Sequence, residues 1–275
     1  MTLNNTDFTN ISIVASDLDG TLLAPDHQLS AFTKQTLKQL NEQGFTFIFA
    51  TGRHHVDVSY IKDTVGIPAY MITSNGARVH DIDGNLMYSQ NVNAEYVQGV
   101  VDIMRQDPDI IIHMYQDEQW WVNQADEQLL AFSQSSGFAF SLFDDSNAPK
   151  ENIAKLFFTH KDHEHLAQFE AQLNSQFADK LNVAFSTPWC LEVMQGNVSK
   201  GHALQAVANS LNKQLTNCIA FGDGMNDAEM LSMAGMGKVM QTAHPKVKAA
   251  LPNHEVIGSH EDDAVAHYLL KHLLI

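Results

Sequence analysis

The sequence predicts an α/β fold in which a mainly parallel sheet is interrupted by an inserted α+β unit. Short apolar runs alternate with helical segments near both ends of the chain, as expected of a parallel sheet covered by helices. In the middle of the chain the pattern changes to several strand-like runs with few helices between them. The length of 275 residues also fits two domains of about 150 residues each.

The first elements are a buried strand and an amphipathic helix. The run ISIVAS at 11–16 is β-branched and apolar, which is typical of a strand buried on both faces. Ser30 stands where it can cap a helix with an apolar stripe, and Gly44 is expected to end that helix. Asp83-Gly84 predicts a hairpin turn. Similar apolar runs predict further strands over 45–50, 69–74 and 217–222.

The middle region is predicted to be a separate unit over 87–188, which leaves 1–86 and 189–275 as a discontinuous core. A helix is expected over 164–177, where apolar residues recur at helical spacing. Strand-like runs occupy 109–123, 138–143, 154–160 and 181–194. No repeat or linker-like tract marks the junctions, so the boundaries rest on the change of pattern alone.

Composition restricts the possible functions. Lysine and arginine number 16 and aspartate and glutamate 32, giving a formal charge of −16, which argues against binding to nucleic acid or an anionic membrane surface. Cys190 and Cys218 lack the spacing of a disulfide framework or a zinc site. The opening MTLNNTDFTN lacks a signal-peptide pattern, and no apolar run approaches the ~20 residues of a membrane span. We therefore expect a cytoplasmic protein.

Three polar residues follow three predicted strands. Asp17, Thr51 and Asp223 each come directly after an apolar run. Ligands of open α/β sheets bind beyond the carboxyl ends of the strands. We therefore expect these three segments to converge on one crevice.

A fourth segment, NVSKGHALQAVANSL, indicates an anion site. Ser199 is predicted to cap a helix that places Lys200 in its first turn. A cation at this end opposes the helix dipole, so its presence favours a bound anion that also meets the free backbone N–H groups. The ligand we infer is phosphate.

The paired aspartates then have a chemical purpose. Asp17, Asp19 and Asp223 offer the hard oxygen ligands that Mg²⁺ prefers, and the metal would relieve their mutual repulsion. One carboxylate can attack phosphorus while its neighbour protonates the leaving oxygen and then activates water. We assign attack to Asp17 and acid/base catalysis to Asp19.

Four segments in order, DLDGTLL, TFIFATGR, SKG and FGDGMNDAEML, resemble the motifs of the haloacid dehalogenase superfamily and its Cof-type phosphatases. The resemblance implies a Rossmann-like core with a large α/β cap inserted between the second and third motifs. It implies that Asp17 is the nucleophile and Asp19 the acid/base residue. It implies phosphate contacts from the Leu18 backbone, Thr51, Gly52, Lys200 and Asn226. The implied Mg²⁺ site comprises Asp17, Asp19 and Asp223, supported by Asp227.

Longer segments, among them FATGRHH, CLEVMQGNVSKG and VIGSHEDDAVAHYL, are similar to the group that hydrolyses hydroxymethylpyrimidine pyrophosphate (HMP-PP), a thiamin precursor. This resemblance implies a small phosphorylated heteroaromatic substrate such as HMP-PP or pyridoxal phosphate. One loop departs from the family, because Gln241-Thr242-Ala243 stands where Gly-Asn-Ala is common.

Several residues have two interpretations. Arg53 either contacts substrate phosphate or forms an ion pair, and Asn75-Gly76 either shapes the pocket or turns the chain. His54 and His55 are placed where they could line the cleft. The histidines of HKDHEH at 160–165 are interpreted as solvated surface. A calcium loop from Asp17 is excluded, because Gly and Glu do not fall at the sixth and twelfth positions.

The pair Trp120 and Trp121 is expected to point to opposite faces of a strand. One indole would pack inside the inserted unit, while the other would be more exposed and available to stack on an aromatic substrate.

Three functions remain possible from the sequence. The first is a Mg²⁺-dependent phosphohydrolase with an aspartyl-phosphate intermediate. The second is a phosphomutase or phosphotransferase of the same fold, which returns the phosphate to substrate. The third is a signalling protein that holds a phosphorylated aspartate without turnover, although such a receiver lacks the inserted unit. Oligomeric state is not predicted.

Overall fold

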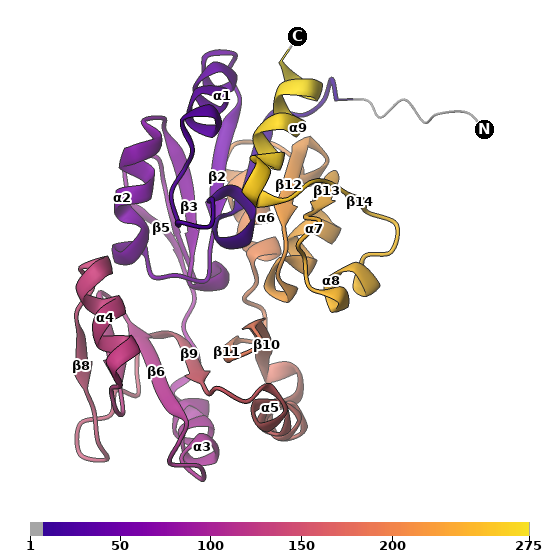
Figure 1. The fold of residues 1–275 in the computed structure, drawn as a ribbon. Coiled ribbons are helices and arrows are strands. Elements are labelled where there is room, and N and C mark those ends of the chain that lie inside the picture. The colour runs from indigo at the N-terminus through magenta and orange to yellow at the C-terminus, as the bar shows by residue number, and fades with distance from the viewer. Residues whose placement is uncertain (1–7, 275) are drawn as a thin grey trace.

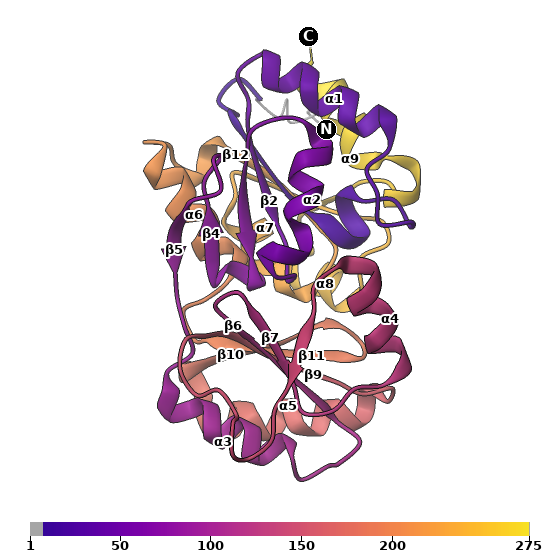
Figure 2. The same cartoon turned by 90° about the vertical axis from the view of Figure 1, so that its left-hand side faces the viewer.

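The computed structural model describes residues 8–274, which form two sheets, each with its own helices (Figure 1). The first is an eight-stranded sheet built from both ends of the chain, and the second is a six-stranded sheet built from the middle. The two units lie one above the other in both views (Figure 2). Within the described residues, no helix is both long and apolar enough to span a bilayer.

The first sheet has the strand order β14-β13-β12-β1-β2-β3-β4-β5. Pairing is parallel from β14 to β3, and β4 and β5 add an antiparallel edge. The predicted hairpin turn around Asp83-Gly84 joins β4 to β5. The strands are β1 (Ile13–Asp17), β2 (Thr46–Ala50), β3 (Ala69–Thr73), β4 (Arg78–His80), β5 (Leu86–Ser89), β12 (Cys218–Gly222), β13 (Met236–Val239) and β14 (Glu255–Val256).

Alternate strand residues point to opposite sides of this sheet. Because apolar residues occupy both sides, helices cover both faces. Val14 and Phe47 pack on one side, against α1 (Ala31–Glu42), α2 (His55–Val65) and α9 (Ala264–Leu273). Ile13 and Ile48 pack on the other, against α6 (Lys200–Ser210), α7 (Ala228–Met233) and α8 (Pro245–Ala250). All four side chains are buried, and burial of each contributes roughly 1.5–3 kcal/mol. The predicted α/β class is confirmed.

The second sheet has the order β10-β11-β9-β6-β7-β8 and is antiparallel except between β7 and β8. Helices α3 (Ala94–Met104) and α5 (His163–Phe177) pack on one face, while α4 (Glu127–Ser136) connects β7 to β8. The strands are β6 (Ile111–Gln116), β7 (Gln119–Val122), β8 (Phe140–Leu142), β9 (Ile153–Thr159), β10 (Leu181–Thr187) and β11 (Cys190–Gln195).

Strand β5 crosses the predicted boundary at 87, and strand β11 lies on the wrong side of the predicted boundary at 188. Leu86–Ser89 is the edge strand of the first sheet, since it pairs with β4. Cys190–Gln195 belongs to the second sheet, where it pairs with β10 and β9. The physical reason is burial: Leu191 and Val193 are fully buried in the apolar cluster beneath α3 and α5. We call the second unit the cap.

The opposite face of the cap sheet packs on the carboxyl ends of the core strands. Tyr115, Phe157 and Met194 from the cap share one buried cluster with Ala77 and Val198 from the core. Figure 2 shows the cap sheet lying across the ends of the core strands.

Candidate active site

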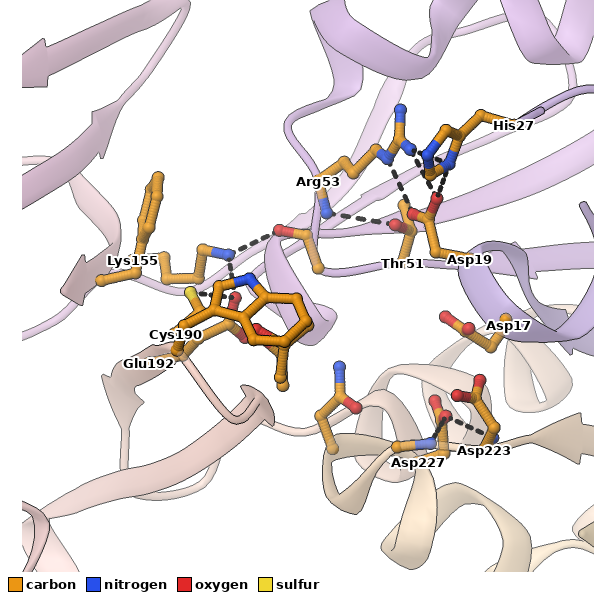
Figure 3. Close-up of a pocket in the computed structure, with 18 of the residues that line it drawn as sticks. Asp17, Asp19, His27, Thr51, Arg53, Lys155, Cys190, Glu192, Asp223 and Asp227 are labelled. Atoms are coloured by element: carbon orange, nitrogen blue, oxygen red, sulfur yellow. Dashed lines mark hydrogen bonds and ion pairs between the residues drawn. The ribbon is translucent and has the colours of Figure 1, made fainter. Parts of the chain in front are cut away.

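Asp17, Thr51 and Asp223 lie together at the edge of the first sheet, as their positions after three strands predict. They line one cavity of about 530 Å³ between the core and the cap. Figure 3 shows three groups of labelled side chains around it: Asp17 with Asp223 and Asp227, Asp19 with Arg53 and His27, and Lys155 with Cys190 and Glu192. Gly52 and Asn226 also line this cavity.

Lys200 is the fully buried cation of the site. Its Nζ lies 2.6 Å from Asp17 Oδ1 and 2.6 Å from Asp227 Oδ1. Ser199 caps α6 by accepting the backbone N–H of His202 at 3.1 Å, as the sequence predicts. Burial lowers the pKa of Lys200, but the charges of Asp17 and Asp227 outweigh burial and raise it. Lys200 therefore remains protonated and holds both carboxylates in place.

Gly76 positions the start of this helix and does not itself line the cavity. Its φ is +101°, and a Cβ there would lie 2.3 Å from the backbone oxygen of Ser199. Only glycine permits this approach between the loop after β3 and the residue that precedes Lys200. Of the two interpretations of Asn75-Gly76, the glycine therefore fits the turn of the chain. It lets the loop after β3 pack closely against the start of α6.

Three carboxylates form an acidic cluster. Ligand oxygens of Asp17, Asp223 and Asp227 all lie within 4.8 Å of one another. Burial and the neighbouring Asp227 raise the pKa of Asp223 to about 6, although Thr21 donates to its Oδ1 at 2.7 Å. Burial and Asp227 likewise raise the pKa of Asp17 well above its usual range.

The cluster fits a divalent cation. Two buried carboxylates and the half-buried Asp223 face a single ammonium group, so their ionised form carries uncompensated negative charge, which a hard cation would neutralise. The carboxylate oxygens of Asp17 and Asp223 accept fewer hydrogen bonds than those of Asp227. Asp227 is already bound by Lys200 and by the backbone N–H groups of Asp223 and Gly224, at 3.0 and 2.9 Å.

The Asp19 carboxylate lies outside this cluster, which departs from its expected place among the metal ligands. Arg53 binds it through Nε at 2.7 Å and Nη2 at 2.5 Å, and His27 Nδ1 lies 3.0 Å away. Burial raises the pKa of Asp19, but the hydrogen bonds and charges of Arg53 and His27 outweigh this and lower it. Arg53 also pairs with Asp57 at 3.6 Å and lines the cavity, so it forms the ion pair of one interpretation and stands where the substrate contact of the other would be made.

The turn after β1 is shaped by the acidic cluster. Gly20 has a φ of +78°, and a Cβ there would lie 2.6 Å from Asp223 Oδ2. Leu18 is fully buried in the core, and it is not among the residues that line the cavity. The sequence DLDGT thus needs a glycine at the point where the loop passes the carboxylate of Asp223.

The cap contributes a buried ion pair that the sequence interpretation missed. Lys155 of β9 donates to Glu192 Oε1 of β11 at 2.7 Å and to the Gly52 backbone oxygen at 2.6 Å. Asn75 Nδ2 donates to Glu192 Oε2, and Asn75 Oδ1 accepts from Asn226 Nδ2 at 3.0 Å. Asn75 therefore links the cap to Asn226 and is buried behind the cavity wall. The available signal was one charged residue within each apolar strand.

Neither tryptophan of QWWVN lines the cavity. Trp120 is buried and donates to His113 Nδ1 at 3.3 Å, while Trp121 is partly buried and donates to Gln116 Oε1 at 3.0 Å. The expected stacking of either indole on substrate is therefore wrong. Trp189, which the sequence interpretation did not single out, is 58% exposed and lines the cavity.

His54 and His55 join the core to the cap and do not line the cavity. His54 Nδ1 accepts the Val56 N–H at 3.2 Å, so its Nε2 carries the proton donated to the Asp117 backbone oxygen at 2.7 Å. His55 Nε2 contacts Glu118 at 2.8 Å. Burial lowers the pKa of His54 to about 3, which keeps its ring neutral.

The unusual loop at Gln241-Thr242 borders the site. Gln241 donates its N–H to the Gly258 backbone oxygen at 3.1 Å. Thr242 and Ala243 line a neighbouring cavity of about 360 Å³, which also touches Asp223 and Trp189. The departure from the family pattern thus lies beside the acidic cluster.

The sequence profile of the haloacid dehalogenase-like hydrolases matches residues 14–269, and the chain belongs to this family. A Haemophilus influenzae protein is 44% identical over 257 residues, which are 93% of this chain and 94% of that protein. The HMP-PP phosphatase of Yersinia pseudotuberculosis serotype O:1b is 40% identical over 257 residues, 94% of this chain and 93% of that enzyme.

A solved haloacid dehalogenase-like hydrolase from B. subtilis has the same fold. Its TM-score is 0.84 at 25% identity, with 96% of this chain and 100% of that chain covered. The predicted family is therefore confirmed, and the protein is a hydrolase of the phosphatase type.

Proposed function

We propose that the protein is a Mg²⁺-dependent phosphohydrolase of small phosphorylated metabolites, acting through an aspartyl-phosphate on Asp17. The observation that carries the proposal is the geometry around Lys200. This buried ammonium holds Asp17 2.6 Å away at the carboxyl end of β1, with Asp223 and Asp227 beside it. A nucleophile, a cation and a metal-ligand set thus meet at one end of the cavity between core and cap.

The first step transfers the phosphoryl group to the protein. An oxygen of Asp17 attacks phosphorus, the bond from phosphorus to the leaving oxygen breaks, and Asp19 supplies the proton that this oxygen takes. Thr51, Gly52, Lys200, Asn226 and the Leu18 backbone bind the phosphate oxygens. Mg²⁺ held by the acidic cluster would neutralise those oxygens during transfer.

The second step returns Asp17 to its free form. Asp19, now ionised, takes a proton from water, whose oxygen attacks phosphorus and releases inorganic phosphate. The contacts of Asp19 with Arg53 and His27 favour this ionised form. The acid role requires the carboxylate to leave Arg53 and turn toward the substrate.

We further propose a phosphorylated heteroaromatic substrate, such as HMP-PP or pyridoxal phosphate. The support is the 40% identity to an HMP-PP phosphatase over nearly the whole chain, together with the aromatic side chains Tyr115, Phe157 and Trp189 at the cap end of the cavity. Hydrolysis is favoured over a stable phospho-acceptor role, because the cap encloses a cavity large enough for a metabolite.

The test measures phosphate release by the purified protein from a panel of phosphorylated metabolites, with Mg²⁺ or with EDTA. We expect Mg²⁺-dependent turnover by the wild type and loss of turnover by Asp17→Asn with the fold retained. Near-normal turnover by Asp17→Asn would remove Asp17 as the nucleophile. Transfer of phosphate to an acceptor other than water would favour the phosphomutase or phosphotransferase alternative.

A further inference from the structure

Trp189 presents an indole at the mouth of the active-site cavity. It lies in the hairpin between β10 and β11, and 58% of its surface is exposed. It lines the cavity that holds Asp17 and Asp223 as well as two neighbouring cavities. A large exposed aromatic surface beside a catalytic cavity is typical of a ligand contact.

The hairpin that carries this indole is fixed to the rest of the cap. His160 donates its backbone N–H to the Trp189 oxygen at 3.2 Å. His163 Nδ1 lies 2.9 Å from the Pro188 backbone oxygen, which can only accept, so this nitrogen carries the proton. The His163 ring also contacts Phe185, with centroids 4.6 Å apart. The ring of His163, expected to be solvated surface, and the backbone of His160 thus hold the backbone of the hairpin at Pro188 and Trp189.

Thr187 adds a polar contact on the same hairpin. Its Oγ1 is buried and has no hydrogen-bond partner among the described residues, yet the residue lines the same cavity. A buried hydroxyl without a partner is unfavourable. A ligand that supplies a donor or acceptor at this point would relieve that cost.

The charged groups at the cap end are already bound to one another. Lys155 and Glu192 form an ion pair at 2.7 Å, and Cys190 Sγ donates to Glu192 Oε1 at 3.9 Å. This end therefore offers ring faces and a few hydroxyls, those of Thr187, Tyr115 and Ser186. A sugar ring carries several hydroxyls that each need a partner, whereas a planar heteroaromatic ring needs few and can stack on an indole.

We propose that Trp189 and Thr187 form the site for the leaving group and select a planar heteroaromatic ring with a hydrogen-bonding substituent. The ring stacks on the Trp189 indole, and the substituent pairs with Thr187 Oγ1. This inference rests on the proposed phosphatase function and assigns substrate choice to the β10–β11 hairpin.

The experiment compares kcat/KM for three substrates with Mg²⁺: pyridoxal 5′-phosphate, glucose 6-phosphate and acetyl phosphate, which has no ring. We expect Trp189→Ala to lower kcat/KM for pyridoxal phosphate by about ten- to hundredfold, the range of aromatic stacking. Acetyl phosphate should change by less than about twofold. Trp189→Phe should retain most of the preference. Thr187→Val should weaken it, while Thr187→Ser, which keeps the hydroxyl, should not.

Two results would overturn the inference: an equal loss for all three substrates in Trp189→Ala, or a wild type that prefers glucose 6-phosphate. Binding of pyridoxal phosphate to Asp17→Asn, with and without Trp189→Ala, needs no turnover and tests the hairpin separately. If no phosphate ester is hydrolysed but the Trp189 change weakens this binding, the proposed reaction fails and the binding site stands. If both variants bind equally, the binding site fails.

Discussion

The Nζ of Lys155 in the cap lies 2.6 Å from the backbone oxygen of Gly52 in the core. The same ammonium pairs with Glu192, packs 4.6 Å from the centre of the Phe157 ring and is almost wholly removed from solvent. Buried ion pairs seldom stabilise a fold more than apolar residues of similar volume. We therefore interpret this pair as one that fixes the position of the loops it contacts, Gly52 directly and Asn226 through Asn75.

Glu192→Gln should impair catalysis through Asn75 and Asn226. A glutamine amide cannot accept hydrogen bonds with both terminal atoms, so either Lys155 or Asn75 loses its partner. We expect kcat/KM to fall about tenfold or more, since a broken charged hydrogen bond is worth roughly 1.5–3 kcal/mol. Asp145→Asn breaks an exposed ion pair with Arg105 in the same cap and should have little effect.

A double-mutant cycle separates positioning from general damage. In an Asn226→Ala background, Glu192→Gln should cost less than it does alone, because the group that it positions is gone. The inhibition constant of orthophosphate gives a second measurement at the phosphate end. Full additivity in both measurements would show that Glu192 does not act through Asn226.

Residues near the strand ends were predictable because their positions follow from local pattern. Asp17, Thr51 and Asp223 each follow an apolar strand, and parallel strands bring their carboxyl ends to one edge. Lys200 followed from its unusual place in the first turn of a helix. In each case the residues that carry the signal are neighbours in the sequence.

Residues of the cap were not predictable in the same way. Glu192 and Lys155 have a clear role only once β11 and β9 are known to be adjacent and to face the core. The predicted boundary at 188 also assigned Glu192 to the wrong unit. Trp120 and Trp121 attracted attention as a pair, but a period of two decides only that they face opposite sides, not which side meets substrate. Trp189 lies in a local hairpin, but its place beside the cavity depends on how the cap packs on the core, which its sequence neighbours do not indicate.

Asp19→Asn should slow turnover far more than substrate binding. The change removes the group assigned to both proton transfers, and general acid/base catalysis contributes about 10²–10⁴-fold. We expect kcat to fall in this range with a smaller change in KM, measured by steady-state kinetics at saturating Mg²⁺. Asp26→Asn, which alters a nearby exposed carboxylate on the same loop, is the matched control. A change confined to KM would contradict the acid/base assignment.

The acidic cluster predicts a linked dependence of stability on pH and Mg²⁺. Folding raises the pKa of Asp223 from 3.8 to about 6, so the metal-free folded state binds this proton more tightly than the unfolded state does. The contribution of Asp223 to stability therefore declines as pH rises through this window. Mg²⁺ binds the ionised cluster, so it should raise Tm more at pH 7.5 than at pH 4.5.

Asp223→Asn isolates this contribution from that of other groups. Without metal, the Tm of the wild type should fall relative to that of the variant as pH rises from 4 to 6. The variant should also show a smaller shift with Mg²⁺ at pH 7.5. Equal Mg²⁺ shifts in both proteins at pH 7.5 would show that Asp223 is not a ligand.

Gly76→Ala should impair both stability and turnover, because the loop after β3 sets the position of Lys200. Gly76 and Gly84 both have positive φ, +101° and +89°. An alanine in such a conformation costs about 1–2 kcal/mol, equivalent to roughly 2–4 °C in Tm per kcal/mol for a chain of this size. At Gly84 nothing lies within 4 Å of a new Cβ, so Gly84→Ala should show this backbone cost alone.

At Gly76 the new Cβ would lie 2.3 Å from the Ser199 backbone oxygen and 2.6 Å from its carbon, so the start of α6 must move. Lys200 follows Ser199 directly and holds Asp17 and Asp227 at 2.6 Å each. A shift of even part of an ångström therefore misaligns the nucleophile. We expect Gly76→Ala to lower Tm by more than Gly84→Ala and to lower kcat/KM at least tenfold, while Gly84→Ala keeps normal activity. Equal losses of Tm in the two variants, with activity unchanged in both, would show that the contact between this loop and α6 does not position the catalytic lysine.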